Sequence, residues 1–412
     1  MSLLVLSGAD VDGVAASMTP DQLQLLMAQV FAGLSASSKA RSGVINIHMP
    51  PRIILPTENH TALFMPARIG RVPATTSDSA VTNDEGSDMS IIGTAVKVVC
   101  VPNESDPRGL PGTTLVLDEV TGAVKAVVNA RKLTALRNAA GSLLSTTLVG
   151  PTEPRNIVAF GAGQQIEAHI DMHLRHLATL SRCTIVNRTI NARATALVER
   201  LRAKHGSRAA EFSLIPSTSG SARNTTTREG VEDAVRAADI IVCATSSTEP
   251  LFPSAWVRNG THVILIGSYK PIMHEIDTAL VRRALPTSTP SSHETSRRIP
   301  ILLVDSREDC LKEAGELITA GTRSDHVTEI GELLPTTAEG SLSVAQYHDI
   351  VSSGKRGLRS HVDLPEGFDG PVTMFKSVGI GLQDVAIASA VVNKALSLGN
   401  HAVGTVVADY DA

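Results

Sequence analysis

Residues 156–165 read Asn156-Ile-Val-Ala-Phe-Gly-Ala-Gly-Gln-Gln165, and this stretch decides the fold. A short apolar run leads into a glycine-rich turn and then an amphipathic segment, which is the pattern of strand, tight turn and helix. Glycine at the first turn position allows a sharp bend, and glycine at the third lets a pyrophosphate approach the positive end of the helix. The stretch therefore predicts a dinucleotide site. The residues assigned to it are Gly161, Ala162, Gly163, Gln164 and Gln165.

The fingerprint departs from its usual form at Ile166, where a third glycine or alanine is common. A second apolar run, Cys183–Val186, ends 20 residues later, and Asn187, Arg188 and Thr189 follow it. An acidic residue at this place would bind the ribose 2′-hydroxyl of NAD, whereas an arginine suits a 2′-phosphate through two parallel hydrogen bonds. We therefore expect NADP(H) in preference to NAD, with a solvated surface arginine as the alternative interpretation.

Length and composition favour two domains and a small ligand. The chain has 412 residues, 42% of them hydrophobic, which is enough for two ordinary cores. A net charge of −4 and a pI near 6.4 give no reason to expect nucleic acid or an anionic membrane as partner. No apolar run reaches membrane-spanning length, and the first residues lack the features of a signal peptide. A cytoplasmic protein is expected.

The cysteines also favour a reducing compartment such as the cytoplasm. The chain has four, without CxxC spacing, and each lies in or beside an apolar run: Cys100, Cys183, Cys243 and Cys310. This distribution suits reduced, buried thiols better than disulfides or a zinc site.

Before the dinucleotide stretch, short apolar runs alternate with turn signals, which predicts a mainly antiparallel sheet. The expected strands are residues 3–6, 52–55, 62–65, 96–101, 114–118 and 123–128. Helices are expected at 20–34 and 133–149, and Gly150-Pro151 then indicates a domain boundary. Residues 75–90, rich in Ser, Thr, Asp and Asn, predict a surface loop.

The rest of the chain predicts a Rossmann-type, doubly wound α/β domain over residues 152–345, beside an α+β domain over residues 1–151. Further strands are expected at 212–215, 240–244, 262–267 and 301–305, which gives a sheet of about six strands. Residues 286–298 predict an extended loop, and residues 308–317 and 375–398 predict helices.

Several short motifs occur in a fixed order along nearly the whole chain. They include Phe64-Met-Pro-Ala67, Val96-Lys-Val-Val99, Leu133-Thr-Ala-Leu-Arg137, Gly161-Ala-Gly163, Asp305-Ser-Arg-Glu308, Glu313-Ala-Gly315 and Phe375-Lys-Ser-Val-Gly379. Together they resemble the ornithine cyclodeaminase and mu-crystallin family. The resemblance implies a homodimer whose first domain binds substrate and pairs with its twin through a β-sheet. It also implies that residues 346–412 return to that domain.

Three basic residues lie in matching motifs: Arg52, Lys97 and Arg137. The resemblance assigns Arg52 and Arg137 to the substrate α-carboxylate, a task for which the guanidinium fork is well shaped. It assigns Lys97 to the carboxylate or the reacting nitrogen, where a lysine desolvated near other cations can move a proton. Without the resemblance, each is explained more simply as a solvated or structurally paired base. Cofactor-side positions of the family are matched by Asn138, Thr245 and Ser377, with packing or turn capping as the alternative.

One position departs from the cyclodeaminase pattern. In ornithine cyclodeaminases an aspartate stands two residues before a proline and binds the substrate amine, whereas Tyr269 stands there in this chain. A neutral phenol cannot pair with an ammonium as a carboxylate does, although Glu275 and Asp277 lie close in sequence and could compensate. The Asn187-Arg188-Thr189 signature resembles the mu-crystallin branch, whose ketimine reductase activity uses NADPH. Both features favour reduction.

The leading hypothesis is an NADPH-dependent reductase acting on a C=N bond next to a carboxylate, or the reverse amino-acid oxidation. The alternatives are an NAD-dependent ornithine cyclodeaminase that forms proline and ammonia, and a non-catalytic protein that binds NADPH and a small ligand. The joint presence of Arg52, Lys97 and Arg137 disfavours the last. No metal is expected, because His169, Asp171, His173 and His176 have no matching ligand set elsewhere and predict a polar helix face.

Overall fold

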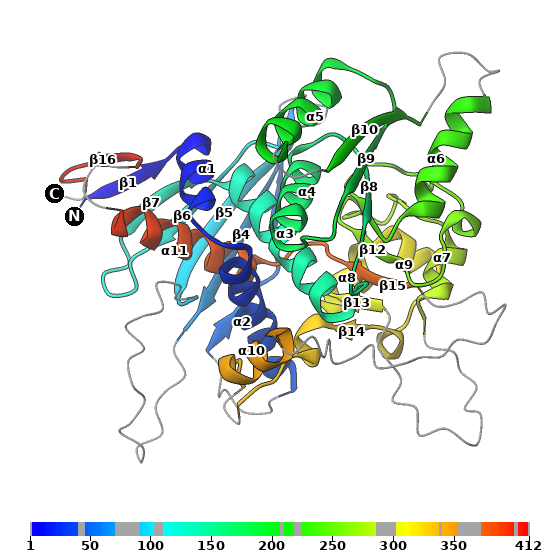
Figure 1. Ribbon diagram of the computed structural model, residues 1–412. Coiled ribbons are helices and arrows are strands. Elements are labelled where there is room, and N and C mark those ends of the chain that lie inside the picture. The colour runs from blue at the N-terminus through cyan, green and yellow to red at the C-terminus, as the bar shows by residue number, and fades with distance from the viewer. Residues whose placement is uncertain are drawn as a thin grey trace. The chain divides into compact units, whose positions relative to one another are not determined.

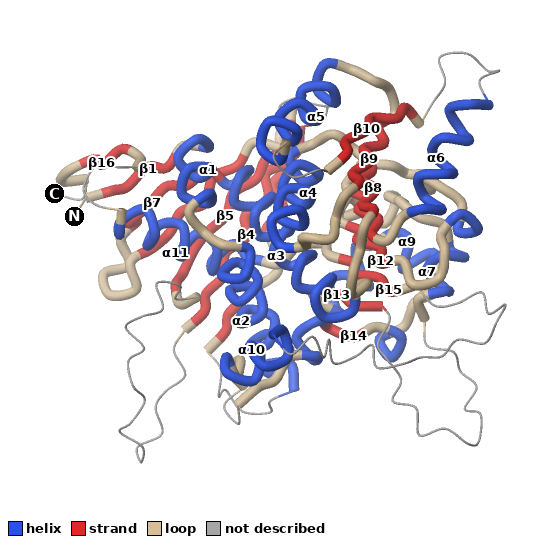
Figure 2. The backbone as a smooth tube through the Cα atoms, viewed as in Figure 1, coloured by secondary structure: helices blue, strands red, loops and turns tan. Residues whose placement is uncertain are grey.

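The computed structural model describes residues 2–39, 46–70, 91–102, 110–206, 210–217, 225–285, 302–337, 340–352, 372–398 and 403–410. The predicted loops at 75–90 and 286–298 lie outside these residues. The chain divides into two compact units. The first comprises Met1–Ala140, Leu334–Ser343 and Ile380–Ala412, and the second Gly141–Leu333 and Val344–Gly379. Figures 1 and 2 show their helices and strands.

The first unit is an α+β unit built on one sheet. Its strands are β1 Leu3–Leu6, β2 Ile47–His48, β3 Ile53–Pro56, β4 His60–Ile69, β5 Gly93–Pro102, β6 Gly112–Leu117, β7 Val124–Asn129 and β16 Thr405–Val407. They lie in the order β16-β1-β7-β6-β5-β4-β2, with β3 paired to β4. All pairs are antiparallel except β1 with β7, so the predicted antiparallel sheet is confirmed.

Helices bury the apolar side of this sheet. They are α1 Gly8–Ala16, α2 Pro20–Lys39, α11 Gly381–Ser397 and the first half of α3 Ala130–Val149. Thr19 and Gln22 begin α2 with reciprocal side-chain to backbone hydrogen bonds, which satisfy amide groups of the first turn. Helix α11 packs against β4, β5 and α2, and its first turn is fully buried. Any charged group in that turn is thereby held away from water.

The second unit is the predicted doubly wound sheet. Its strands are β8 Asn156–Phe160, β9 Arg182–Asn187, β10 Glu211–Pro216, β11 Ile240–Cys243, β12 His262–Leu265, β13 Leu302–Val304, β14 Thr328–Glu329 and β15 Thr373–Lys376. Its helices are α4 Gln164–His176, α5 Ala192–His205, α6 Thr225–Ala237, α7 Thr278–Arg283, α8 Arg307–Glu313, α9 Gly315–Thr319 and α10 Val344–Ser352, with short 3-10 turns at Ser254–Trp256, Ser324–His326 and Ile330–Leu333.

The strands of this sheet are all parallel and lie in the order β10-β9-β8-β11-β12-β15-β13-β14. The chain reverses its direction of travel across the sheet between β8 and β11. In an open parallel sheet, ligands bind at such a switch point, beyond the carboxyl ends of the strands. The fold therefore places the Gly161–Gly163 turn, which follows β8, at the expected site.

Two expectations about the C-terminal part are wrong. Residues 375–398 do not form one helical region: β15 ends at Lys376, and Gly379, with a φ of +85°, precedes α11. Because β15 lies between β12 and β13, residues 344–379 belong to the second unit instead of returning to the first at 346.

The first domain boundary lies earlier than Pro151, inside α3. The second half of that helix belongs to the second unit, where Ser142 and Thr146 bond to side chains of α4.

Candidate functional site

The glycine turn after β8 has the geometry that an anion requires. Gly161 has a φ of +114°, and a Cβ there would lie 3.0 Å from the Ala244 carbonyl oxygen, so only glycine fits. Gly163 is the N-cap of α4 and has no side-chain cap, while a Cβ on it would meet nothing within 4 Å. The start of α4 thus has no side-chain cap and has room beside Gly163, as a pyrophosphate site needs.

The next residue carries an independent sign of a ligand. Gln164 Oε1 is buried and has no hydrogen-bond partner among the described residues. A buried acceptor without a partner is costly, and a bound ligand with a donor group relieves that cost. The residues present in this turn, with Ala162 buried below it, therefore fit a dinucleotide.

The ribose-side residues lie where β9 ends. Asn187 Nδ2 donates to the Thr189 carbonyl oxygen at 2.8 Å, which fixes the turn between them. Arg188 and Thr189 are exposed. A guanidinium at this position can reach a 2′-phosphate, since the carboxyl ends of β8 and β9 share one edge of the sheet.

A buried carboxylate joins the ends of the next two strands. Glu275 accepts hydrogen bonds from the Thr245 amide at 2.6 Å, the Thr245 hydroxyl at 3.0 Å and the Gly267 amide at 2.8 Å. Burial raises the pKa of Glu275 to about 7, although Lys376 and the two amides oppose the shift. The predicted cofactor-side residue Thr245 is therefore held by its neighbours after β11, and its hydroxyl is already bonded.

The other predicted residue on this side, Ser377, follows β15. Its hydroxyl donates to Asp305 Oδ2 at 2.6 Å, and the same oxygen accepts from the Gly379 amide at 2.7 Å. Lys376, fully buried, lies 3.1 Å from Glu316 and donates to the Ser268 carbonyl oxygen at 2.6 Å. These bonds fix the carboxyl end of β15 beside that of β12.

In the Tyr269 region, the two nearby carboxylates contact the backbone. Tyr269 is half-buried, and desolvation raises the pKa of its phenol, so the side chain is neutral near pH 7. Glu275 is fully buried in the contacts above. Asp277 caps α7 by accepting from the Leu280 amide at 2.7 Å and also accepts from the Ser254 amide at 2.8 Å. Both acidic residues that could have compensated hold the backbone instead.

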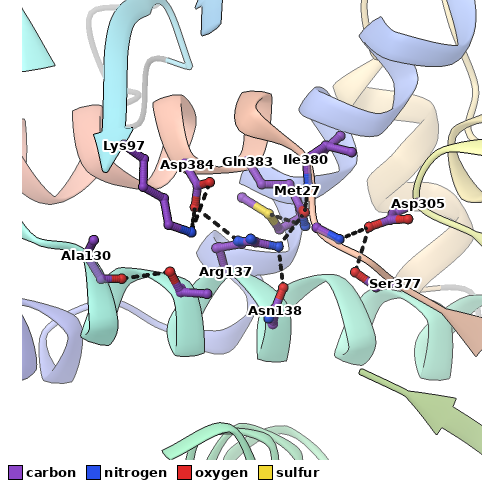
Figure 3. Close-up of polar contacts among 12 residues, drawn as sticks. Met27, Lys97, Ala130, Arg137, Asn138, Asp305, Ser377, Ile380, Gln383 and Asp384 are labelled. Atoms are coloured by element: carbon purple, nitrogen blue, oxygen red, sulfur yellow. Dashed lines mark hydrogen bonds and ion pairs between the residues drawn. The ribbon is translucent and has the colours of Figure 1, made fainter. Parts of the chain in front are cut away.

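The first unit contains a buried cluster of basic and acidic side chains (Figure 3). Lys97 on β5 places Nζ 3.2 Å from both carboxylate oxygens of Asp384, in the first turn of α11. Arg137 on α3 donates through Nε to Asp384 Oδ1 at 3.2 Å. Its Nη1 donates to Gln383 Oε1 at 2.8 Å and also to Asn138 Oδ1. These contacts are made by Nε and Nη1 of the guanidinium.

The electrostatics of the cluster favour an anion and a mobile proton. Burial lowers the pKa of Lys97 to about 8, Asp384 opposes this shift, and the charges of Arg137 and Arg52 add to it. The structure thus brings together Lys97 and Arg137, and Arg52 acts on Lys97 electrostatically from a half-buried position one residue before β3. Asn138 accepts a hydrogen bond from Arg137 in this unit, and its binding of a cofactor phosphate stays a prediction.

Sequence reasoning missed Asp384 and Gln383. Both lie in the segment Gly381-Leu-Gln-Asp-Val385, and no motif match drew attention to them. The available signal was an acidic residue in the first turn of an otherwise apolar helix. A carboxylate in such a place is costly to bury unless a cation pairs with it.

The polar helix face predicted on α4 is wrong for two of its four residues. His169 and His173 are fully buried, and their Nε2 atoms each lie 2.9 Å from a hydroxyl of α3, on Ser142 and Thr146. Burial lowers the pKa of His169 to about 4 and that of His173 to about 3, so both are neutral. Within the described residues, His, Cys, Asp and Glu form no group suited to a metal ion.

The cysteines of the chain are free thiols. Three of them are buried, and Cys100 is partly exposed. In the part of the chain that the structure describes, no helix combines the length and the apolar character needed to cross a bilayer.

A Rossmann-type unit with an open glycine turn, joined to a unit with a buried basic cluster, defines the class of dinucleotide-dependent oxidoreductases. Comparison with known proteins narrows this class. The chain belongs to the ornithine cyclodeaminase/mu-crystallin family, whose model matches residues 14–399.

Two curated relatives are similar over most of the chain. Delta(1)-pyrroline-2-carboxylate reductase of Paracoccus denitrificans is 30% identical over 278 residues, 66% of this chain and 77% of the relative. Ketimine reductase mu-crystallin of Mus musculus is 26% identical over 369 residues, 89% of this chain and 91% of the relative. Among solved structures, the Thermococcus litoralis Delta(1)-pyrroline-2-carboxylate reductase, in complex with NADH and L-proline, aligns with a TM-score of 0.67 and 22% identity, covering 98% of this chain and 99% of that one.

Proposed function

We propose that this protein is an NADPH-dependent reductase of imino acids or ketimines, able also to run the reverse amino-acid oxidation. The observation that carries the proposal is the buried cluster of the first unit, in which Lys97 and Arg137 share the single carboxylate of Asp384. Two basic groups on one anion leave positive charge for a substrate carboxylate. The names of the relatives, a pyrroline-2-carboxylate reductase and a ketimine reductase, support the same chemistry.

In this proposal each basic residue has one task. The guanidinium of Arg137, with Arg52, binds the substrate carboxylate and so orients the C=N bond. Lys97 Nζ gives a proton to the imine nitrogen, and the electron pair of the broken N–H bond stays on Nζ. Nicotinamide, when bound, supplies the hydride that the imine carbon receives.

Three features support a preference for NADPH and for reduction over cyclodeamination. Arg188 at the end of β9 offers a guanidinium to a 2′-phosphate. Tyr269 is a neutral phenol, and Glu275 is buried among backbone amides, so neither is suited to pair with a substrate ammonium. Imine reduction requires no such anion.

The proposed assembly is a homodimer formed through the sheet of the first unit. Strand β3 is an edge strand that pairs with only part of β4, and its apolar side chains face water. Ile53 is 60%, Ile54 61% and Leu55 52% exposed. An exposed apolar edge strand is a liability that a second copy would cover.

A substrate panel tests the proposed activity. Purified protein is mixed with NADPH and with cyclic and linear imino acids, and with the matching imines that lack a carboxylate, while absorbance at the NADPH band is followed. We expect turnover only with the carboxylate-bearing compounds. A parallel incubation with ornithine and NAD is assayed for proline, and rapid proline formation without net NADH would assign the chain to cyclodeamination instead.

A further inference from the structure

Asp384 is the residue that links the two buried bases of the first unit. Its side chain lies in the first turn of α11 and is 2% exposed. Both of its oxygens lie 3.2 Å from Lys97 Nζ, and Oδ1 lies 3.2 Å from Arg137 Nε. One carboxylate therefore bridges a strand and a helix that are distant in sequence, as Figure 3 shows.

The charges around Lys97 come from three elements. Asp384 on α11 favours the ammonium, whereas Arg137 on α3 and Arg52 before β3 disfavour it. The neighbouring strands contribute Met65 and Thr114 at the positions directly across from Lys97, and neither titrates. Among the described residues, Asp384 is thus the anion that favours the protonated form of Lys97, against the effects of burial and of two cations.

The position of the ammonium depends on the same carboxylate. A lysine side chain has four rotatable bonds and presents a point charge, so its direction is set by its partners. Gln383 accepts from Arg137 and from the Ile380 amide at 3.3 Å, which ties the guanidinium to the start of the same helix turn. A single turn of α11 therefore fixes both bases.

We propose that Asp384 is a positioning residue that keeps Lys97 protonated and holds Lys97 and Arg137 in register. The inference rests on the proposed reduction, in which Lys97 delivers a proton to the substrate nitrogen and afterwards regains one from water. Asp384 does not itself contact the reacting atoms. It determines the pH range over which Lys97 acts as a donor.

The test follows Lys97 directly in the full-length protein. The pKa of Lys97 is read from the 13Cε shift of labelled lysine between pH 4.5 and 11, with the resonance assigned by Lys97→Arg. In Asp384→Asn we expect the pKa to fall by roughly 1 to 3, the usual effect of removing an adjacent opposite charge. In Asp384→Glu we expect it to stay near that of the wild type, while kcat falls because the added methylene displaces the carboxylate.

Ser389→Ala provides a matched control, since Ser389 is buried in the same helix and its hydroxyl has no partner among the described residues. It should leave the Lys97 titration unchanged. The alkaline limb of kcat/KM should move with the NMR titration in Asp384→Asn, while the affinity for NADPH stays as in the wild type. An unchanged Lys97 pKa in Asp384→Asn overturns the inference.

Two further outcomes are also decisive. If Asp384→Asn fails to fold, the kcat of Asp384→Glu tests the inference in its place. A wild-type kcat in that variant would contradict a positioning role. If the protein reduces no imino acid at all, the proposed function fails, but the titration needs no substrate and still decides whether Asp384 holds the proton on Lys97.

Discussion

Arg188 illustrates how much chemistry can rest on one exposed side chain. The residue follows β9 directly, where an acidic group would select NAD, and its guanidinium suits the additional phosphate of NADP. A charge-assisted hydrogen bond of this kind contributes about 1.5–3 kcal/mol, or roughly 10- to 150-fold in Kd. We expect Arg188→Ala to raise the Kd for NADPH by that factor and so to abolish the preference for NADPH over NADH. Fluorescence titration with both cofactors measures the two Kd values. Tighter binding of NADH by the wild type would contradict the interpretation.

Lys97 predicts the pH dependence of the reaction. Burial lowers its pKa to about 8, so the ammonium is the main form below pH 8 and the neutral amine above it. A proton donor is lost when the pH rises through its pKa. We expect kcat/KM for imine reduction to be flat below about pH 7.5 and to fall roughly tenfold per pH unit well above 8. The reverse oxidation should show the opposite limb, and a flat reduction profile up to pH 10 would exclude Lys97 as the donor.

At the residue scale, the sequence was informative where one side chain conflicted with its immediate surroundings. Lys97 could be named as a candidate site residue because an ammonium is unexpected in an apolar strand. Arg137 could be named because it lies in a recognisable motif. Asp384 could not, since its partners lie 287 and 247 residues away and only the packed structure brings them together. The burial of His169 and His173 was missed for the same reason: the hydroxyls that bond them belong to α3.

At the scale of elements, the strand ends of the second unit predict contrasting effects for two glycines. At Gly163, a Cβ meets nothing within 4 Å and φ is −94°, so Gly163→Ala should fold as the wild type does. It should nevertheless weaken NADPH binding strongly, because the methyl group fills the space that a pyrophosphate needs. At Gly267, a Cβ would lie 1.9 Å from the Thr245 carbonyl oxygen.

Gly267→Ala should therefore destabilise the fold by about 1–3 kcal/mol or more, since overpacking against backbone cannot relax easily. The two variants are compared by urea unfolding and by NADPH titration. Comparison of Gly163→Ala with Gly267→Ala separates a loss of space for the cofactor from a loss of stability through overpacking. Normal NADPH affinity in Gly163→Ala would place the pyrophosphate elsewhere.

Elements could be predicted where their pattern was local. The strands of the first unit except β2 and β16, and the βαβ unit around β8, follow from alternating apolar residues and turn signals within short windows. Strand β15, Thr373–Lys376, escaped prediction because it is short and only four residues separate it from the apolar helix α11. It is a strand because it pairs with β12 and β13 in the folded sheet.

At the scale of the whole molecule, β3 predicts the state of assembly. It carries three consecutive exposed apolar residues, and an exposed apolar edge strand tends to associate with another chain. Ile54→Asp should convert the proposed dimer to a monomer at micromolar concentration, as measured by sedimentation velocity. Val120→Asp is the control, because Val120 is 92% exposed in a turn away from this strand. An Ile54→Asp protein that sediments as the wild type does would exclude β3 from the interface.

The buried histidines give the second unit a specific sensitivity to acid. The pKa of His169 is lowered from 6.5 to about 4 and that of His173 to about 3, because burial penalises the charged form. Between pH 6.5 and 4 the unfolded chain therefore binds protons that the folded chain does not. Stability falls as the pH falls through this window, by about 1.4 kcal/mol per pH unit for each histidine.

Glu275 contributes with the opposite sign, because its pKa is raised to about 7 and its contribution is lost as the pH rises from 4.5 to 7. The histidine effect is isolated by His169→Gln and His173→Gln, since glutamine can still bond the hydroxyls of Ser142 and Thr146 but does not titrate. We expect the urea midpoint of the double variant to decline less between pH 6.5 and 4.5 than that of the wild type. Equal declines in the two proteins would mean that these histidines do not cause the loss of stability in acid.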